Sequence, residues 1–494
     1  MKKIKPMHGT SKAKGCSHMN LGNFCELFGK GKLSSWADDC GIKDRCEAEK
    51  IAALLGGVGS IMHDASGDSA DCDIPAAYTF FAQFVDHDIT LDTTTALHGE
   101  ELDASAISKL PNLRSASLDL DCVYGFGPEA SPFQYDPVQP GRMLVGSDVD
   151  GISNPNDLPR NSVGRALIGD PRNDENIFVS QLQLLFIRFH NRRLVGRSFE
   201  KTQEDVRYHY QYIVLNDFLK RVCDEDIYNF ALPKIVENAR KAPKDRDYPF
   251  CNLLDKCGRI CMPVEFSVAA YRFGHTMVRS VYPVNDGHPA IELFDERFGT
   301  LGFGPVPPEL TVDWRFLLDV QKCFPHVKSK AIDHLLADEL IHMPDPIVGR
   351  NSPANDRSLA FRNLLRGYVL GLPSGQKAAK ALKDKGYPID PGQDLKFNDI
   401  PGWECLGDDA KKIAKHTPLF FYLMREGGAL HNGERLGPVA SAILLEVFGN
   451  MFVHCSSYLK AKEDGKYWEP DSCVAHTDGE LTLRDIVHYV SAAS

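Results

Sequence analysis

The sequence has none of the long apolar runs that cross a membrane. No stretch of about 18 uninterrupted apolar residues occurs among its 494 residues, so we predict no transmembrane helix. The first lysines of the chain, Lys2, Lys3 and Lys5, are not followed by the apolar segment of a secretory signal. A signal peptide is therefore not expected at this N-terminus.

Positive charge is also scarce. The chain has 56 lysines and arginines against 67 aspartates and glutamates, which gives a formal net charge of −11. Binding to nucleic acid or to an anionic membrane needs basic patches, so neither is expected as the main partner. The hydrophobic content of 43% is that of an ordinary globular protein. A chain of this length can enclose a cofactor in its interior.

The cysteines form no clear metal or haem motif. No C-x-x-C-H sequence occurs, which excludes thioether attachment of a c-type haem. Cys257 and Cys261 have a C-x-x-x-C spacing but lack the second pair that a zinc site needs. Because no signal peptide is visible, we expect the 14 cysteines to be reduced and mostly buried thiols.

The apolar pattern predicts a mainly α-helical fold with little β structure. Strand signals, such as alternating Val, Ile and Thr between glycine turns, are scarce. We interpret residues 1–73 as an N-terminal extension and predict that residues 74–494 form one large helical domain, because no clear linker interrupts them. The predicted helices that carry the candidate functional residues span 74–88, 171–196, 263–280 and 357–371.

The first of these helices has a polar face. Gln83, Asp86 and His87 are related by three and four positions, so they share one face of a helix. Asp88 is turned away from His87 by about 100°. Polar groups on the inner face of an apolar helix are costly unless they serve chemistry or are fully hydrogen-bonded. A charged helix end is the structural alternative.

The second predicted helix has a positive charge in its first turn, where the helix dipole disfavours it. Asp170 is a suitable N-cap and Pro171 a suitable first-turn residue. Arg172, however, stands in the first turn, where a cation opposes the helix dipole. Glu175 is three residues further on and shares its face. A structural helix start does not explain Arg172, which favours a functional role.

The last two helices carry a possible metal ligand and its support. His275 lies on or beside the apolar stripe of its helix, where a satisfied core histidine is the more common case. The preceding Gly274 costs about 1 kcal/mol in a helix interior and would let a flat cofactor approach the backbone. Asn363 and Arg366 are again three residues apart. Asn363 could bond the second ring nitrogen of a histidine ligand, and Arg366 could pair with a carboxylate.

Together these segments resemble the animal-type haem peroxidases of the peroxidase–cyclooxygenase superfamily. Four motifs of that family occur in the family's order: Gln-x-x-Asp-His-Asp at 83–88, Gly-Asp-x-Arg-x-x-Glu at 169–175, Arg-x-Gly-His at 272–275 and Asn-x-x-Arg at 363–366. The likeness runs from about residue 74 to about residue 455 and leaves out the N-terminal extension.

The resemblance implies a haem b site and a role for each motif residue. His275 would ligate the iron, with Asn363 as its partner and Arg272 beside it in the proximal motif. On the distal side, His87 would be the acid–base, Arg172 would stabilise developing charge, and Gln83 would hold peroxide, water or a halide. Asp86 and Glu175 would form ester bonds to haem methyl groups, and Arg366 could pair with a propionate. Asn176 replaces the Met that forms a third haem link in some relatives.

The resemblance also implies a calcium site. The segment Ser115–Asp121 is similar to the calcium loop of the family. Ser115, the carbonyl of Ser117, Asp119 and Asp121 would supply oxygen ligands, joined by Asp88 from the distal helix. The ion would then anchor the helix that carries His87.

The reaction expected from the resemblance is the reduction of hydrogen peroxide coupled to oxidation of iodide, bromide, thiocyanate or phenols. A fatty-acid dioxygenase is the first alternative. Its tyrosine radical stands three residues before the proximal histidine, a position that Arg272 occupies here, while Tyr271 is one residue off. A haem-binding adhesion or sensor module is the second. The compartment stays open, since the family favours an extracytoplasmic setting but no signal peptide is visible.

Overall fold

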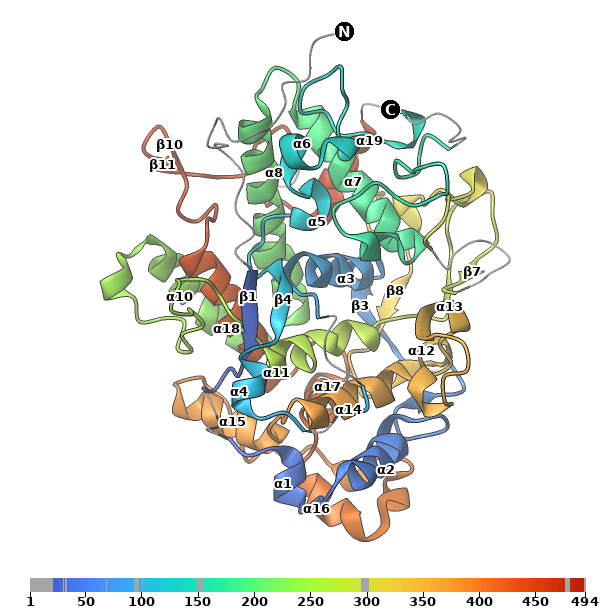
Figure 1. The fold of residues 1–494 in the computed structure, drawn as a ribbon, viewed down its shortest axis with the longest axis vertical. Helices are drawn as coiled ribbons and strands as arrows, with labels where there is room; N and C mark the ends of the chain where they lie inside the picture. Colours follow the sequence, from blue (N-terminus) through green and yellow to red (C-terminus); the bar gives the residue numbers. More distant parts are fainter. Residues whose placement is uncertain are drawn as a thin grey trace.

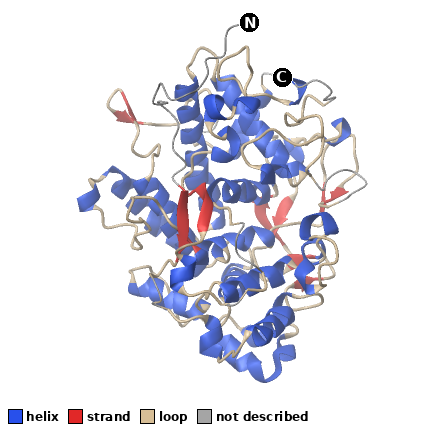
Figure 2. Cartoon of the chain, viewed as in Figure 1, coloured by secondary structure: helices blue, strands red, loops and turns tan. Residues whose placement is uncertain are grey.

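The structure, a computed structural model, describes residues 21–29, 31, 33–67, 69–92, 97–99, 101–148, 154–294, 302–475 and 480–492. It is mainly α-helical, with small sheets scattered among the helices (Figure 2), as predicted. The helices of the first half are α1 (Trp36–Cys40), α2 (Arg45–Gly56), α3 (Ala77–Ile89), α4 (Ala104–Ile107), α5 (Asp121–Tyr124), α6 (Gly127–Ala130), α7 (Ile177–Arg193), α8 (Phe199–Ile213), α9 (Leu219–Val222) and α10 (Glu225–Arg240).

The second half of the chain is also mainly α-helical. Its helices are α11 (Val264–Ser267), α12 (Asp338–Ile341), α13 (Asp345–Val348), α14 (Leu359–Val369), α15 (Gly375–Asp384), α16 (Ala410–Lys415), α17 (Leu419–His431), α18 (Pro438–His454) and α19 (Leu483–Ser491). Two short 3₁₀ helices carry functional candidates, η3 (Pro171–Asp174) and η6 (Ala270–His275). None of the helices in the described part of the chain combines the length and the apolar character that a membrane crossing requires.

The strands are short, and several of them pair with strands far away in the sequence. A three-stranded sheet has the order β4–β1–β5, from β4 (Pro111–Ser115), β1 (Leu21–Cys25) and β5 (Met262–Pro263). β1 runs antiparallel to β4 and parallel to β5. The two-stranded pairs are β2 (His63–Asp64) with β9 (Leu336–Ala337), β3 (Asp71–Pro75) with β8 (Lys328–Lys330), β6 (Val281–Tyr282) with β7 (Ile291–Glu292), and β10 (Lys462–Glu463) with β11 (Lys466–Tyr467).

Helix α3 lies at the centre of the molecule (Figure 1) and is almost wholly buried. It packs against α7, β4 and η6, which bring together segments that are far apart in the sequence. Gln83 is the one residue of α3 that is only half-buried. A helix held on so many sides can present polar side chains in a fixed geometry, because its apolar residues leave no room for it to turn.

The predicted helix over 263–280 is wrong. The structure ends α11 at Ser267 and restarts the chain as η6 at Ala270. Ala269 between them has non-helical angles, φ −129° and ψ −73°. The Nε–H of Arg272 donates to the carbonyl of Ser267 at 2.7 Å, so a side chain satisfies an acceptor that the helix leaves free.

The described part of the predicted N-terminal extension is folded onto the rest of the chain. Strand β1 belongs to the three-stranded sheet, and α2 packs along α14. The backbone N–H of Leu27 donates to the carboxylate of Glu265 at 2.9 Å. Residues 1–20 lie outside the described residues, and the predicted boundary at residue 73 stays a prediction.

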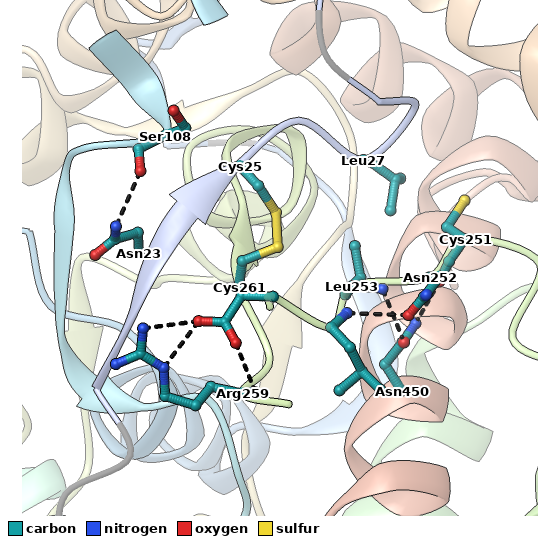
Figure 3. The surroundings of a disulfide bond; sticks show 12 residues. Asn23, Cys25, Leu27, Ser108, Cys251, Asn252, Leu253, Arg259, Cys261 and Asn450 are labelled. Carbon is teal, nitrogen blue, oxygen red and sulfur yellow. Dashed lines mark hydrogen bonds and ion pairs between the residues drawn. A yellow bond between two sulfur atoms is a disulfide. The ribbon is translucent and has the colours of Figure 1, made fainter. Parts of the chain in front are cut away.

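A disulfide joins this N-terminal part to the centre of the chain (Figure 3). Cys25 of β1 bonds to Cys261, next to β5, with the two Cα atoms 5.8 Å apart. The expectation of reduced thiols is therefore wrong for this pair, because pairing of β1 with β5 brings together two cysteines 236 residues apart. The expectation of burial holds in part: Cys40, Cys72, Cys122, Cys223 and Cys251 are buried thiols, and Cys46, Cys257, Cys323, Cys405 and Cys473 are exposed.

Candidate active site

A cavity of about 400 Å³ lies between α3, η6, α12 and the segment that follows η3. Its size is within the range of small-molecule and cofactor sites. Polar and apolar side chains share its wall. The polar ones are Thr79, Gln83, Asp86, His87, Glu175, Asn176, Tyr271, Arg272 and His275, and the apolar ones include Phe80, Val278, Leu293, Phe294, Phe303, Leu340, Met343, Ile347 and Leu359.

The polar face of α3 opens into this cavity. Gln83, Asp86 and His87 all line it, whereas Asp88 is fully buried on another side of the helix. The helical period that the sequence predicted therefore separates the four polar residues into two groups. The structural alternative, a charged helix end, does not apply, because this end of α3 is buried.

His87 is held by a buried chain of side-chain amides. Its Nδ1 lies 2.8 Å from the Oδ1 of Asn173. The Nδ2 of Asn173 in turn donates to the Oε1 of Gln183 at 2.8 Å. Since that second bond makes Oδ1 the free acceptor of Asn173, the proton of His87 must be on Nδ1. The Nε2 atom is then an unprotonated base at the cavity wall.

Burial keeps this imidazole neutral. Desolvation, reinforced by the charge of Arg172, lowers the pKa of His87 to about 4. The nearby Glu175 shifts the other way, because burial raises its pKa to about 7 despite Arg172 and the bond from Gln83. Nε2 of His87 lies 3.6 Å from Oε1 of Glu175. A neutral base and a carboxyl close to its titration point therefore share the cavity.

Asn176 fixes the orientation of Gln83, another polar side chain of the cavity wall. Its Oδ1 accepts from the backbone N–H of Val179, so it is the N-cap of α7. Its Nδ2 donates to the Oε1 of Gln83 at 3.0 Å. The Nε2 of Gln83 donates to Glu175. The start of α7 thus sets how Gln83 faces the cavity.

Arg172 lies behind His87 rather than in the cavity wall. It is not among the described residues that line the cavity. Its guanidinium contacts Asp170 at 2.7 Å and donates to the backbone carbonyl of His87 at 3.0 Å. The carboxylate of Asp170 accounts for the cation at this helix start, which the sequence left unexplained.

Asp86 joins the distal helix to the proximal segment. Its Oδ1 accepts from the hydroxyl of Thr90 at 2.9 Å, and its Oδ2 lies 3.3 Å from Nη1 of Arg272. Burial alone would raise the pKa of Asp86, but the positive charges of Arg272 and Arg172 hold it below its usual value. Asp86 is therefore an ionised carboxylate at neutral pH, in contrast to Glu175.

On the proximal side, His275 closes η6 and enters the cavity wall. Nδ2 of Asn363 on α14 donates to its Nδ1 at 2.9 Å, so in this arrangement the ring proton is on Nε2. A metal ion at Nε2 requires the amide of Asn363 to turn, so that its oxygen accepts from Nδ1. Burial lowers the pKa of His275 to about 3, so the ring is neutral. Gly274 and Ala82 also line the cavity, and a Cβ on Gly274 would come within 3.7 Å of the Ala82 Cβ. Small residues thus let η6 pack closely on α3 beside the cavity.

Arg366 does not reach this cavity. It lines a small neighbouring void of about 20 Å³, which Arg272 also borders. Its Nη2 contacts Asp92 at 2.6 Å. A carboxylate partner is what the sequence predicted for Arg366, but here a side chain of the protein fills that place.

The predicted calcium loop forms a buried acidic cluster. Carboxylate oxygens of Asp88, Asp119 and Asp121 lie within 4.8 Å of one another. The hydroxyls of Ser115 and Ser117 both donate to Asp119 at 2.8 Å. Neither oxygen of Asp88 makes a hydrogen bond of ordinary geometry to any described residue. Burial, together with Asp119 and Asp121, raises the pKa of Asp88 well above its usual value.

Several residues at the site had no signal in the sequence. Asn173, Gln183, Thr90 and Asp92 act through contacts between segments that the sequence does not place together. Tyr271, set aside because it is one residue out of register, does line the cavity. Its hydroxyl is buried without a hydrogen-bond partner in the described residues. The 3₁₀ path of η6 changes the direction that an α-helix would have given it.

A family model matches part of the chain. The model described as animal haem peroxidase matches residues 104–303, less than half of the chain, so this region is similar to that family. The match includes the calcium-type loop, Arg172, Glu175 and His275, but neither α3 nor Asn363. The resemblance drawn from the motifs is thereby confirmed. No curated protein sequence matches the chain.

Solved structures share the fold at low sequence identity. Peroxidase A from Dictyostelium discoideum has a TM-score of 0.54 at 12% identity, covering 95% of this chain and 92% of its own. The fatty acid alpha-dioxygenase of Oryza sativa has a TM-score of 0.58 at 15% identity, with 95% and 80% covered. That of Arabidopsis thaliana has a TM-score of 0.59 at 14% identity, with 95% and 78% covered. The chain therefore shares its mainly helical fold with a peroxidase and with fatty acid alpha-dioxygenases.

Proposed function

We propose that this chain is a haem peroxidase that reduces hydrogen peroxide and oxidises small donors. The observation that carries the proposal is the cavity itself. It places a neutral His275, backed by Asn363, and a neutral His87, with a free Nε2, in the wall of one cavity. The wall suits haem b, because His275 and His87 offer ring nitrogens at the cavity and apolar side chains cover much of the rest. A bound haem would supply the iron and the redox chemistry.

The roles of the residues follow from their protonation. His275 would ligate the iron through Nε2, while Asn363 holds Nδ1. Nε2 of His87 would take the proton from one peroxide oxygen and return it to the leaving oxygen. Gln83, oriented by Asn176, would hold peroxide or a halide. The positive charge of Arg172 would act from behind His87 and keep its imidazole unprotonated.

The test is an activity comparison on the purified, haem-loaded chain. We expect hydrogen-peroxide-dependent oxidation of iodide, bromide, thiocyanate or a phenol. Absence of every such activity from a protein with full haem content would overturn the proposal. It would support the silent adhesion or sensor module instead.

A fatty-acid dioxygenase is the second candidate, because the hydroxyl of Tyr271, a residue of the cavity wall, has no hydrogen-bond partner among the described residues. Two of the solved structures that share the fold are fatty acid alpha-dioxygenases. Oxygen uptake with linoleate or palmitate, abolished by Tyr271→Phe, would favour this candidate. No oxygen uptake, with intact peroxidase turnover in Tyr271→Phe, would leave the peroxidase.

We also propose that Asp86 and Glu175 supply two ester links to the haem. Both carboxyl groups line the cavity, one ionised and one protonated near neutral pH. After exposure to hydrogen peroxide, we expect wild-type haem to resist acid–acetone extraction. Asp86→Ala combined with Glu175→Ala should release essentially all of it, and each single variant should leave one link. Freely extractable haem in the wild type would contradict the esters but not the peroxidase.

The buried acidic cluster is proposed as a calcium site. Asp88, Asp119, Asp121, Ser115 and the carbonyl of Ser117 offer oxygen ligands, which calcium prefers. Asp88 and Asp121 are buried and Asp119 is half-buried. Among the described residues only Asp121 of the three has an ion pair, with Arg114 at 3.2 Å, and Arg207 donates to the backbone carbonyl of Asp119. A divalent cation would offset that imbalance, which is otherwise costly.

Chelation is therefore expected to destabilise the protein. A calcium chelator should lower the midpoint of thermal unfolding by about 5 °C or more, and added calcium, but not magnesium, should restore it. Asp119→Ala should abolish the response, whereas the exposed Asp390→Ala should keep it. The measurement is a calorimetric scan. An unfolding midpoint that ignores chelator and calcium would contradict the site.

A further inference from the structure

A second group of possible metal ligands lies outside the cavity and outside the acidic cluster. Nε2 of His63 lies 2.7 Å from Oδ1 of Asp338. Nδ1 of His342 lies 2.9 Å from the same oxygen. The two rings meet edge to face, with centroids 5.4 Å apart. Two imidazole nitrogens thus converge on one carboxylate oxygen.

The backbone fixes this convergence. Strands β2 and β9 run parallel, with His63 opposite Leu336, and the backbone N–H of Leu336 donates to the carbonyl of Met62 at 2.8 Å. Asp338 starts α12 directly after β9, and His342 follows one helical turn later. Residues four apart on a helix face the same way. The arrangement therefore follows from strand pairing and helix geometry, not from long flexible side chains.

We propose that His63, Asp338 and His342 bind a divalent transition-metal ion, with zinc as the ion to be tested. Two imidazole nitrogens and one carboxylate oxygen are ligands that zinc accepts, and a water can complete a tetrahedral shell. The ligand atoms already lie within 4.8 Å of one another. The side chain of His63 is only 6% exposed, against 53% for Asp338 and 44% for His342, so an ion would enter from the solvent side.

The ring proton of His63 in the metal-free protein limits the expected affinity for zinc. The backbone N–H of Gly59 donates to Nδ1 of His63 at 3.0 Å, so Nε2 carries the ring proton and donates to Asp338. Zinc on Nε2 requires that this proton move to Nδ1, and the Gly59 contact must then open. Gly59 lies in an exposed turn with φ +69°, where its backbone can shift. We therefore expect micromolar rather than tighter binding.

The ion would connect the N-terminal part to the cavity wall. His63 belongs to the first 73 residues, whereas Leu340 and Met343, next to the other two ligands, line the cavity. The site has nitrogen ligands and differs in this from the oxygen-only calcium site. It does not depend on the peroxidase function proposed above.

The test is zinc titration of the full-length, haem-loaded protein by calorimetry. The exposed cysteines are first alkylated, because free thiols also bind zinc. We expect a single micromolar zinc site. His342→Ala and His63→Ala should each weaken it by about 10-fold or more. The matched control is His98→Ala. His98 contacts two carboxylates, Glu49 at 3.0 Å and Asp356 at 2.8 Å, but it shares them with no second histidine in the described residues.

A second measurement does not rely on affinity. Copper(II) added in place of zinc should show coupling to two imidazole nitrogens in its electron paramagnetic resonance spectrum, and to one in His342→Ala. Because His342 is largely exposed, its variant should fold normally, which circular dichroism checks. The proposal is overturned if no zinc binds at millimolar concentration, if both histidine variants bind as the wild type does, or if His98→Ala weakens binding equally.

Discussion

His87→Leu is expected to lower kcat/KM for hydrogen peroxide by about 10²–10⁴-fold at pH 7 while haem content stays unchanged. The leucine keeps the volume of the side chain but removes the one unprotonated imidazole nitrogen on the distal side. The measurement is stopped-flow reduction of peroxide by the haem-loaded variant. Glu175, whose Oε1 lies 3.6 Å from Nε2 of His87, is another group that could take the proton. An unchanged rate in His87→Leu would assign the acid–base role elsewhere, and Glu175→Gln would test that assignment.

The pH dependence of the wild type is part of the same prediction. Because burial and Arg172 lower the pKa of His87 to about 4, its Nε2 stays free to accept a proton from neutral pH down to about pH 4. Below that pH the ring is protonated and the rate falls. The acid limb of kcat/KM should therefore lie near pH 4 rather than near the usual histidine value. A limb near pH 7 would instead match Glu175, whose pKa burial raises to about 7.

The amide chain behind His87 provides the discriminating variants. Asn173→Asp would present a carboxylate to Nδ1, which favours the charged imidazole and should move the acid limb to higher pH. Asn173→Leu would release the ring and should lower the rate without that upward shift. Gln181→Leu is the control, because Gln181 is a buried amide on α7, the helix of Gln183, but donates to the carbonyl of Asn156 instead. A limb that moves equally in all three variants would mean a general loss of structure.

The sequence predicted which candidate residues share a helix face, but not the hydrogen-bond partners of these residues. The helical period alone placed Gln83, Asp86 and His87 on one face and Asp88 on another, because α3 is a regular helix from Ala77 to Ile89. The Asn173–Gln183 pair that sets the proton of His87 depends on how two segments pack. Such contacts leave no local pattern in a single sequence.

The break in the proximal segment was also not predictable from the local sequence. Its apolar spacing predicts one helix, but the side chain of Arg272 captures the carbonyl of Ser267 and the chain continues as a 3₁₀ helix. Neither glycine nor proline marks the break at Ala269. As a result Tyr271 faces the cavity, which an α-helical reading excluded. The Cys25–Cys261 bond was missed likewise, since it joins strands that pair across 236 residues.

His275→Ala is expected to remove most haem binding, which would be the largest effect of any single change proposed here. The ring nitrogen Nε2 of His275 is the proximal candidate for the iron, because Nδ1 is already paired with Asn363 at 2.9 Å. The measurement is haem titration of the purified apoprotein, followed by its Soret absorption. Added imidazole should partly restore the band, since it can occupy the space of the lost ring. His87→Leu is the matched control and should bind haem as the wild type does.

Asn363→Leu separates ligation from support. It leaves Nε2 of His275 in place but removes the partner that orients the ring, so haem affinity should fall by about 10–100-fold rather than vanish. Any ester formed through Asp86 or Glu175 would retain haem and hide this difference, so the titration is done before peroxide is added. A wild-type Soret band in His275→Ala would show that the iron ligand is another residue. An unchanged affinity in Asn363→Leu, with loss in His275→Ala, would show that the hydrogen bond from α14 is not needed to hold the ring.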